Sequence, residues 1–223
     1  FFDQALFLKY AEIHRVSVIP GQAPGFIVPT SEDWRETCSG IPIMNQNVAT
    51  SAPFLVFTDL DGSLMDHESY SIEAAKPALV ALSRRGVTPI FASSKTAVEI
   101  LAAQHASGIT APFICENGAA VYDSSGQILT AFGLPRTSWL HAVHQLRRRL
   151  SLRFTGFSDW PAEKIAELTG LSRADAGKAQ KREFTEPMLW QDTQVKFQLF
   201  QSEIQRLALT TLEGGRFISI QSQ

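Results

Sequence analysis

From residue 53 onward, hydrophobic and polar positions form a repeating pattern that predicts strands and helices in turn. Three short, continuous apolar runs are typical of strands that are buried on both faces of a parallel sheet. These runs are residues 53–58, 87–92 and 112–115. Between them, apolar residues recur at helical spacing in the stretches 71–86 and 96–108. The pattern therefore predicts an α/β fold built on a doubly wound parallel sheet.

Start and stop signals support both predicted helices. Pro77 suits the first turn of the first helix, and Gly86 suits its C-terminal end. In the second helix, Thr96 and Glu99 have the spacing of a capping box, and the helix is expected to end near Gly108.

After residue 115 the pattern changes to short strands mixed with helices. It predicts a hairpin with a Ser-Gly turn, a helix with one apolar face over residues 139–150, and then further short elements. We expect this mixture to form a second, smaller α+β domain. The expected divisions are a first domain at 53–123, the second domain at 124–215, and the start of a return to the first domain at 216–223.

Residues 1–52 differ from the rest, because a short amphipathic stretch is followed by segments rich in Pro and Gly. We expect an extension or a linker here, or else the tail of a preceding domain. Since the sequence does not begin with Met, it is expected to begin partway through a longer product.

Composition and charge argue against several classes of function. The formal net charge of −2 lacks the basic excess that is typical of nucleic-acid-binding proteins. No apolar run approaches the roughly 20 residues of a membrane span. Cys38 and Cys115 lack CxxC spacing, so we expect no zinc site but reduced thiols in a cytoplasmic protein.

The segment FLVFTDLDGSL carries the clearest chemical signal, because Asp59 and Asp61 directly follow an apolar strand. Ligands bind at the carboxyl ends of parallel strands, where the two carboxylates can converge on one site. Such a pair suits Mg²⁺, which prefers carboxylate, water and phosphate oxygens. Asp59 is then placed to attack phosphorus, and Asp61 to protonate the leaving oxygen. Gly62 permits the tight turn.

A calcium loop is the main alternative for a DxDG string. An EF-hand requires Gly at position 6 and Glu at position 12, and a helix precedes it. Here Gly62 is at position 4 and a strand precedes, so calcium binding is disfavoured. A purely structural acidic turn is the other alternative.

Three segments resemble motifs of the haloacid dehalogenase (HAD) phosphatases. DLDGSL is similar to the first motif, DxDx(T/S/V), and FASSKTAVE is similar to the second, in which a hydroxyl group binds phosphate. CENGA is similar to a segment of the Cof-like branch. The resemblance implies phosphate binding by Ser93, Ser94 and Lys95, and substrate binding by Asn117 and Gly118.

Within this branch, residues 53–223 resemble the mannosyl-3-phosphoglycerate phosphatase family, through SSKT, ENGA, TGLSRADA, REFTEP and GGRF. The resemblance implies a HAD core with an inserted α+β cap. It also implies Mg²⁺-dependent hydrolysis of a sugar phosphate, through an aspartyl-phosphate intermediate, to the compatible solute mannosylglycerate. Arg182 and Arg216 become candidates for binding the glycerate carboxylate or the sugar, although either arginine can instead lie on a solvated face.

Two family elements are missing from this sequence. A lysine in a DKG-like string and a GDxxND-like acidic loop are expected after GGRFISI, but the sequence stops at Gln223. We therefore expect the HAD core to be incomplete at its C-terminal end and the chain alone to have little activity. The alternatives are a phosphatase for another sugar phosphate, and a truncated, non-catalytic HAD binding module. By analogy with relatives, the phosphatase could be fused to or follow a synthase domain.

Overall fold

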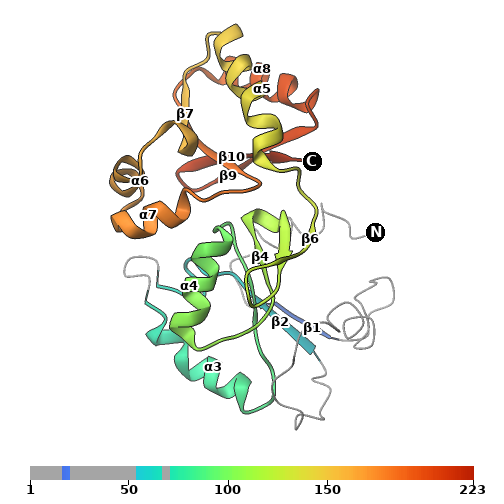
Figure 1. Ribbon diagram of the computed structural model, residues 1–223, viewed down its shortest axis with the longest axis vertical. Coiled ribbons are helices and arrows are strands. Elements are labelled where there is room, and N and C mark those ends of the chain that lie inside the picture. The colour runs from blue at the N-terminus through green and yellow to red at the C-terminus, as the bar shows by residue number, and fades with distance from the viewer. Residues whose placement is uncertain (1–16, 21–53, 67–70) are drawn as a thin grey trace.

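The computed structural model describes residues 17–20, 54–66 and 71–223, which form two domains (Figure 1). The first domain contains a six-stranded sheet in the order β1-β2-β3-β4-β5-β6. Its strands are β1 (Ser17–Pro20), β2 (Phe54–Thr58), β3 (Ile90–Ala92), β4 (Phe113–Cys115), β5 (Ala120–Tyr122) and β6 (Ile128–Ala131). Strands β2, β3 and β4 are parallel, whereas the other pairings are antiparallel. The predicted α/β fold is confirmed, with a mixed sheet.

Two helices connect the parallel strands of this first domain, which is called the core domain below. They are α3 (Lys76–Ser83), preceded by the short η1 (Glu73–Ala75), and α4 (Ala97–Ser107). Because β2, β3 and β4 are adjacent in chain order and such crossovers are right-handed, both helices lie on one face of the sheet (Figure 1). Fully buried Phe91, Ile100 and Phe113 fill the space between helix and sheet.

The second domain, called the cap domain below, has an antiparallel sheet in the order β7-β8-β10-β9. These strands are β7 (Phe154–Gly156), β8 (Glu186–Trp190), β10 (Phe217–Ser222) and β9 (Leu209–Gly214). The helices are α5 (Arg136–Arg149), α6 (Ala162–Thr169), α7 (Arg173–Ala179) and α8 (Gln194–Gln205), with η3 (Phe157–Asp159) after β7. An apolar cluster that includes Trp139, Val143, Phe200 and Met188 joins α5 and α8 to the sheet.

The structure corrects two of the expected domain divisions. Residues 120–131 form the β5–β6 hairpin on the core sheet, because β5 pairs with β4, so the core domain extends past residue 123. Residues 217–222 form β10, which pairs with both β8 and β9 inside the cap sheet. Fully buried Ile220 belongs to the cap cluster, so this strand completes the cap sheet and does not start a return to the core.

The expectations for residues 1–52 and for Cys38 concern residues that lie largely outside the described part of the chain. Of residues 1–52, only Ser17–Pro20 are described, as β1 antiparallel to β2. Cys38 also lies outside. Among the residues described, none of the helices has both the length and the apolar character needed to traverse a bilayer.

Candidate active site

A tight turn directly after β2 carries both predicted aspartates. Leu60 is fully buried, whereas Asp59 and Asp61 on either side of it are partly exposed. The carbonyl of Leu60 accepts the amide of Met65 at 2.7 Å, which closes the turn. Gly62 has a φ of 69°, a left-handed conformation that glycine adopts without strain. Residues 59–65 are called the β2 turn below.

Lys95 connects the second predicted motif to this turn. Its Nζ lies 3.0 Å from Asp61 Oδ1 and 3.9 Å from Glu99 Oε1. The Lys95 side chain is 13% exposed and that of Asp61 is 35% exposed, so the cation sits deeper than its partner. The parallel ends of β2 and β3 therefore bring Lys95 of one segment to Asp61 of the other.

Ser93 directly follows β3 and is buried, and three hydrogen bonds hold it in place. Its amide donates to the Ile114 carbonyl at 3.1 Å, and its carbonyl accepts the Asn117 amide at 3.2 Å. Its Oγ accepts the Lys95 amide at 3.3 Å. A hydroxyl that accepts one N–H keeps its own proton to donate to a second oxygen, such as that of a phosphate. Ser94 is exposed next to it. Residues 93–96 are called the β3–α4 loop below.

Asn117 and Gly118 lie at the end of β4 in left-handed backbone, with φ of 62° and 89°. Gly118 suits this conformation, and Asn tolerates it better than most residues. The Asn117 side chain donates to Gln221 Oε1 of the cap domain at 3.3 Å. The structure thus places Asn117 at the contact between the two domains and next to Ser93.

Of the two candidate arginines, Arg182 reaches the β3–α4 loop. Its Nη1 donates to the Ser94 carbonyl at 3.0 Å and to Thr185 Oγ1 at 2.8 Å, and its guanidinium lies 5.5 Å from the Phe157 ring centroid. Arg216 is exposed in the turn between β9 and β10, and none of these contacts involves it. The structure therefore brings Arg182 to the β3–α4 loop, whereas Arg216 lies in an exposed turn of the cap sheet.

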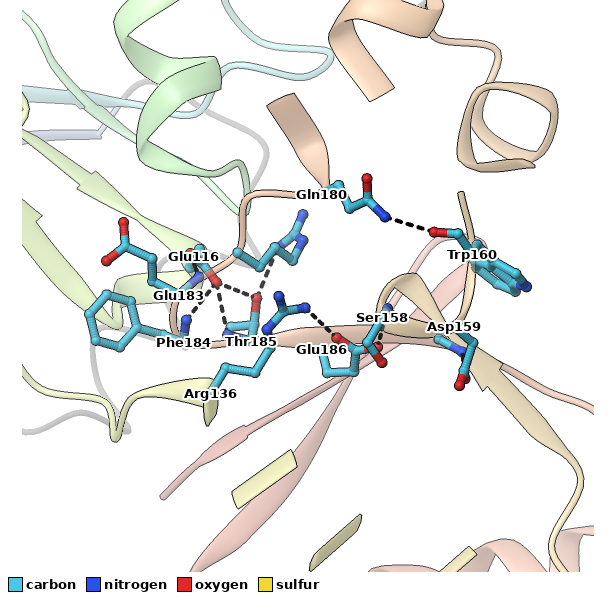
Figure 2. A network of polar contacts seen from close by, with 12 residues as sticks. Glu116, Arg136, Ser158, Asp159, Trp160, Gln180, Glu183, Phe184, Thr185 and Glu186 are labelled. Carbon is cyan, nitrogen blue, oxygen red and sulfur yellow. Dashed lines mark hydrogen bonds and ion pairs between the residues drawn. The ribbon is translucent and has the colours of Figure 1, made fainter. Parts of the chain in front are cut away.

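The sequence did not single out Glu116, which precedes Asn117. Its carboxylate is buried and accepts hydrogen bonds from the cap segment that contains Phe184 and Thr185 (Figure 2). A lone acidic residue directly after the apolar run FIC was the available signal.

A thiol nucleophile at this end of the sheet is disfavoured by electrostatics. Burial, followed by the negative charges of Glu116 and Glu183, raises the pKa of the Cys115 thiol far above its ordinary value. Burial also raises the pKa of the neighbouring Tyr122 hydroxyl. Both groups are therefore neutral at physiological pH and are not the nucleophile.

The donor set at the β2 turn fits a magnesium ion that is shared with a substrate. Mg²⁺ commonly takes one or two carboxylates and completes its shell with waters and phosphate oxygens. Asp59 and Asp61 supply two carboxylates from one turn, and Ser93 and Lys95 lie at the neighbouring strand end. Across the ranges that the structure describes, no three His, Cys, Asp or Glu side chains gather as a metal site.

Comparisons with known proteins agree with this geometry. A family model described as haloacid dehalogenase-like hydrolase matches residues 56–208. A structure of a Thermoplasma acidophilum protein, 0175, aligns with a TM-score of 0.53 and 17% identity, covering 75% of this chain and 63% of that one. A haloacid dehalogenase-like hydrolase from Bacteroides thetaiotaomicron aligns with a TM-score of 0.53 and 16% identity, covering 75% and 70%.

A third structure, described as the HAD subclass IIB sugar phosphatase BT4131, aligns with a TM-score of 0.52 and 14% identity, covering 75% of this chain and 69% of that one. At these identities the likeness concerns the fold. The chain spans between 63% and 70% of the length of these three structures.

Proposed function

Because this chain belongs to the haloacid dehalogenase-like hydrolases, we propose that it hydrolyses phosphate monoesters with Asp59 as the nucleophile. The observation that carries this proposal is the pairing of Asp61 with Lys95 at 3.0 Å, because it joins two motifs from different strands at one site. The buried Ser93 lies in the same loop as Lys95.

The side chains divide the reaction between them. The Asp59 carboxylate attacks phosphorus, and the bond from phosphorus to the ester oxygen breaks, which leaves an aspartyl phosphate. In its protonated form Asp61 gives its proton to the departing oxygen, and the carboxylate that results takes a proton from the water that attacks the aspartyl phosphate. Inorganic phosphate leaves, and Asp59 and Asp61 return to their starting states.

The phosphate is held by the β3–α4 loop. The Ser93 hydroxyl donates to one phosphate oxygen. The Lys95 ammonium, which pairs with Asp61 in the structure, turns to the bound phosphate and pairs with it. Asp59 and Asp61 would hold a Mg²⁺, which would supply positive charge that offsets repulsion between the nucleophile and the phosphate.

The substrate class is a sugar phosphate, with mannosyl-3-phosphoglycerate as the first candidate. Support comes from the sequence segments shared with that phosphatase family and from a fold neighbour described as a sugar phosphatase. Arg182, held beside Ser94, offers a planar fork for the glycerate carboxylate. A different sugar phosphate would lack this carboxylate, and its turnover would not depend on Arg182.

Phosphate release from a panel of esters tests the proposal. We expect turnover that requires Mg²⁺ and falls at least about a hundredfold in Asp59→Asn and in Asp61→Asn, because each loses a group that acts on the reacting atoms. The matched control is Glu73→Gln, since Glu73 is exposed and pairs with Lys76 one turn away. Turnover that survives Asp59→Asn would overturn the mechanism. If simple hexose phosphates are turned over as fast as mannosyl-3-phosphoglycerate, the enzyme is instead a phosphatase for another sugar phosphate.

A further inference from the structure

The Glu116 carboxylate is buried at the contact between the two domains and is 1% exposed. It accepts the amides of Glu183, Phe184 and Thr185 at 2.8, 3.1 and 2.8 Å, and the Thr185 hydroxyl at 2.7 Å (Figure 2). All four donors belong to residues 180–185, the crossing segment between α7 and β8. A buried carboxylate needs such a set of donors, because removing its charge from water is otherwise strongly unfavourable.

The backbone of the same residue holds the β3–α4 loop. The Glu116 amide donates to the Lys95 carbonyl at 3.0 Å, and the next amide, of Asn117, donates to the Ser93 carbonyl at 3.2 Å. Glu116 adopts a φ of 48°, which is unusual for a residue with a side chain. This left-handed backbone directs the amide and the carboxylate of one residue to two different partners. Glu116 is therefore bonded to both the β3–α4 loop and the crossing segment.

A second connection joins the same two segments. Thr185 Oγ1 donates to Glu116 and accepts from Arg182, whose Nη1 also donates to the Ser94 carbonyl. Phe184 lies between these polar residues in sequence and packs in the apolar cluster of the core domain. The contacts form a closed ring, so a change at Glu116 reaches the β3–α4 loop by two routes.

We propose that Glu116 is the positioning residue that docks the cap domain on the β3–α4 loop and thereby holds Arg182 beside the phosphate site. The docking stands on the contacts above, and its consequence for catalysis rests on the proposed phosphatase function. Glu116 touches neither substrate nor reacting atoms, and it acts through Thr185 and Arg182.

Glu116→Gln tests the docking without any assay of activity. Glutamine keeps the size of the side chain but replaces one carboxylate oxygen by an NH₂ group, which cannot accept a hydrogen bond. The N–H and O–H donors that faced that oxygen therefore lose their acceptor. We expect amide hydrogen exchange to quicken at least about tenfold in both the crossing segment and the β3–α4 loop, because both lose a shared support.

The matched control is Asp192→Asn in the cap domain. The Asp192 side chain is 3% exposed, accepts the amides of Arg153 and Thr193 and pairs with Lys196, so the substitution also removes a buried carboxylate that accepts backbone amides, but away from the contact between domains. Its effect should stay near these residues. If Glu116→Gln quickens exchange in the crossing segment alone and leaves residues 93–96 unchanged, its role is local and the proposal is wrong.

Two substrates of different size test the consequence for catalysis. We expect Glu116→Gln to lower kcat/KM at least about tenfold for the best sugar phosphate, mainly through KM, but to change turnover of p-nitrophenyl phosphate less than about twofold. Equal losses on both substrates would overturn the positioning role. If the wild type hydrolyses neither, the proposed function fails, and the exchange pattern still decides the docking.

A milder variant covers the case in which Glu116→Gln does not fold. Thr185→Val keeps the shape of the side chain and removes the hydroxyl that joins Arg182 to Glu116. The same two segments should exchange faster, by a smaller factor. Unchanged exchange in residues 93–96 would again contradict the proposal.

Discussion

Asp159 fixes the turn after β7 against α5 through three hydrogen bonds. Arg147 donates from both of its terminal nitrogens, at 2.6 and 2.9 Å, and the Gly156 amide donates at 2.9 Å. Partial burial by itself raises the pKa of Asp159, but the hydrogen bonds from Arg147 and Gly156 outweigh it and hold the pKa below the ordinary value. The same pairing raises the pKa of Arg147.

This shift predicts how stability depends on pH. A carboxyl whose pKa is lowered by folding contributes stability above its unfolded pKa, here 3.8, and that contribution is lost as the pH falls through its folded pKa. Thermal unfolding of the wild type and Asp159→Asn should therefore differ most near about pH 6, and the difference should shrink below about pH 4. A difference that grows on acidification would contradict the assignment.

Individual site residues were predictable to different degrees. The position of Asp59 and Asp61 at the carboxyl end of a buried strand could be predicted from the residues, whereas phosphate binding by Ser93 and Lys95 was implied by the resemblance to the second HAD motif. The role of Glu116 could not be predicted, because the amides that donate to its carboxylate lie 67 to 69 positions further along the chain. Local sequence carries no information on contacts of that length.

At the scale of elements, α4 begins with the capping box that the sequence predicted. Thr96 accepts the Glu99 amide, and the Glu99 carboxylate accepts the Thr96 amide. The Thr96 hydroxyl also lies 3.1 Å from the Lys178 carbonyl of α7, a contact with the cap domain that the motif does not predict. The start of α4 thus depends on one side chain that is fully buried.

Thr96→Ala should lower the free energy of unfolding by about 1–2 kcal/mol, because the helix loses its N-cap and the Lys178 carbonyl loses a donor. Urea denaturation with Thr96→Ser as the control measures this effect, since serine keeps the hydroxyl. A loss of the same size in Thr96→Ser would show that packing of the methyl group, and not capping, stabilises this end.

Strand lengths and one helix were less predictable. The apolar run at 87–92 yields a strand only at Ile90–Ala92, because Pro89 has no amide to donate to the ladder. Helix α8 (Gln194–Gln205) was not predicted, although Phe197, Phe200 and Ile204 recur at helical spacing and are buried.

At the scale of the whole molecule, each domain has its own apolar cluster, and the domains are connected by polar contacts and by Phe184, which packs in the core cluster. Besides Glu116, these contacts include Asn117 with Gln221, and the Leu134 amide with Ser222 Oγ at 2.9 Å. The last strand, β10, therefore ends beside the segment that leads from β6 into α5 (Figure 1). Periodicity predicted the core helices and their parallel strands but neither α8 nor the domain boundaries, because a strand does not specify locally which sheet it joins.

The central claim is that Asp59 attacks phosphorus, and a covalent trap tests it most directly. The Asp61→Asn variant is mixed with substrate and Mg²⁺ and reduced with borohydride, which converts an aspartyl phosphate to homoserine, and its peptides are analysed by mass spectrometry. We predict homoserine at position 59, since the variant lacks the base that assists hydrolysis of the intermediate. Modification of another residue, or phosphate release without homoserine at this position, would contradict the account.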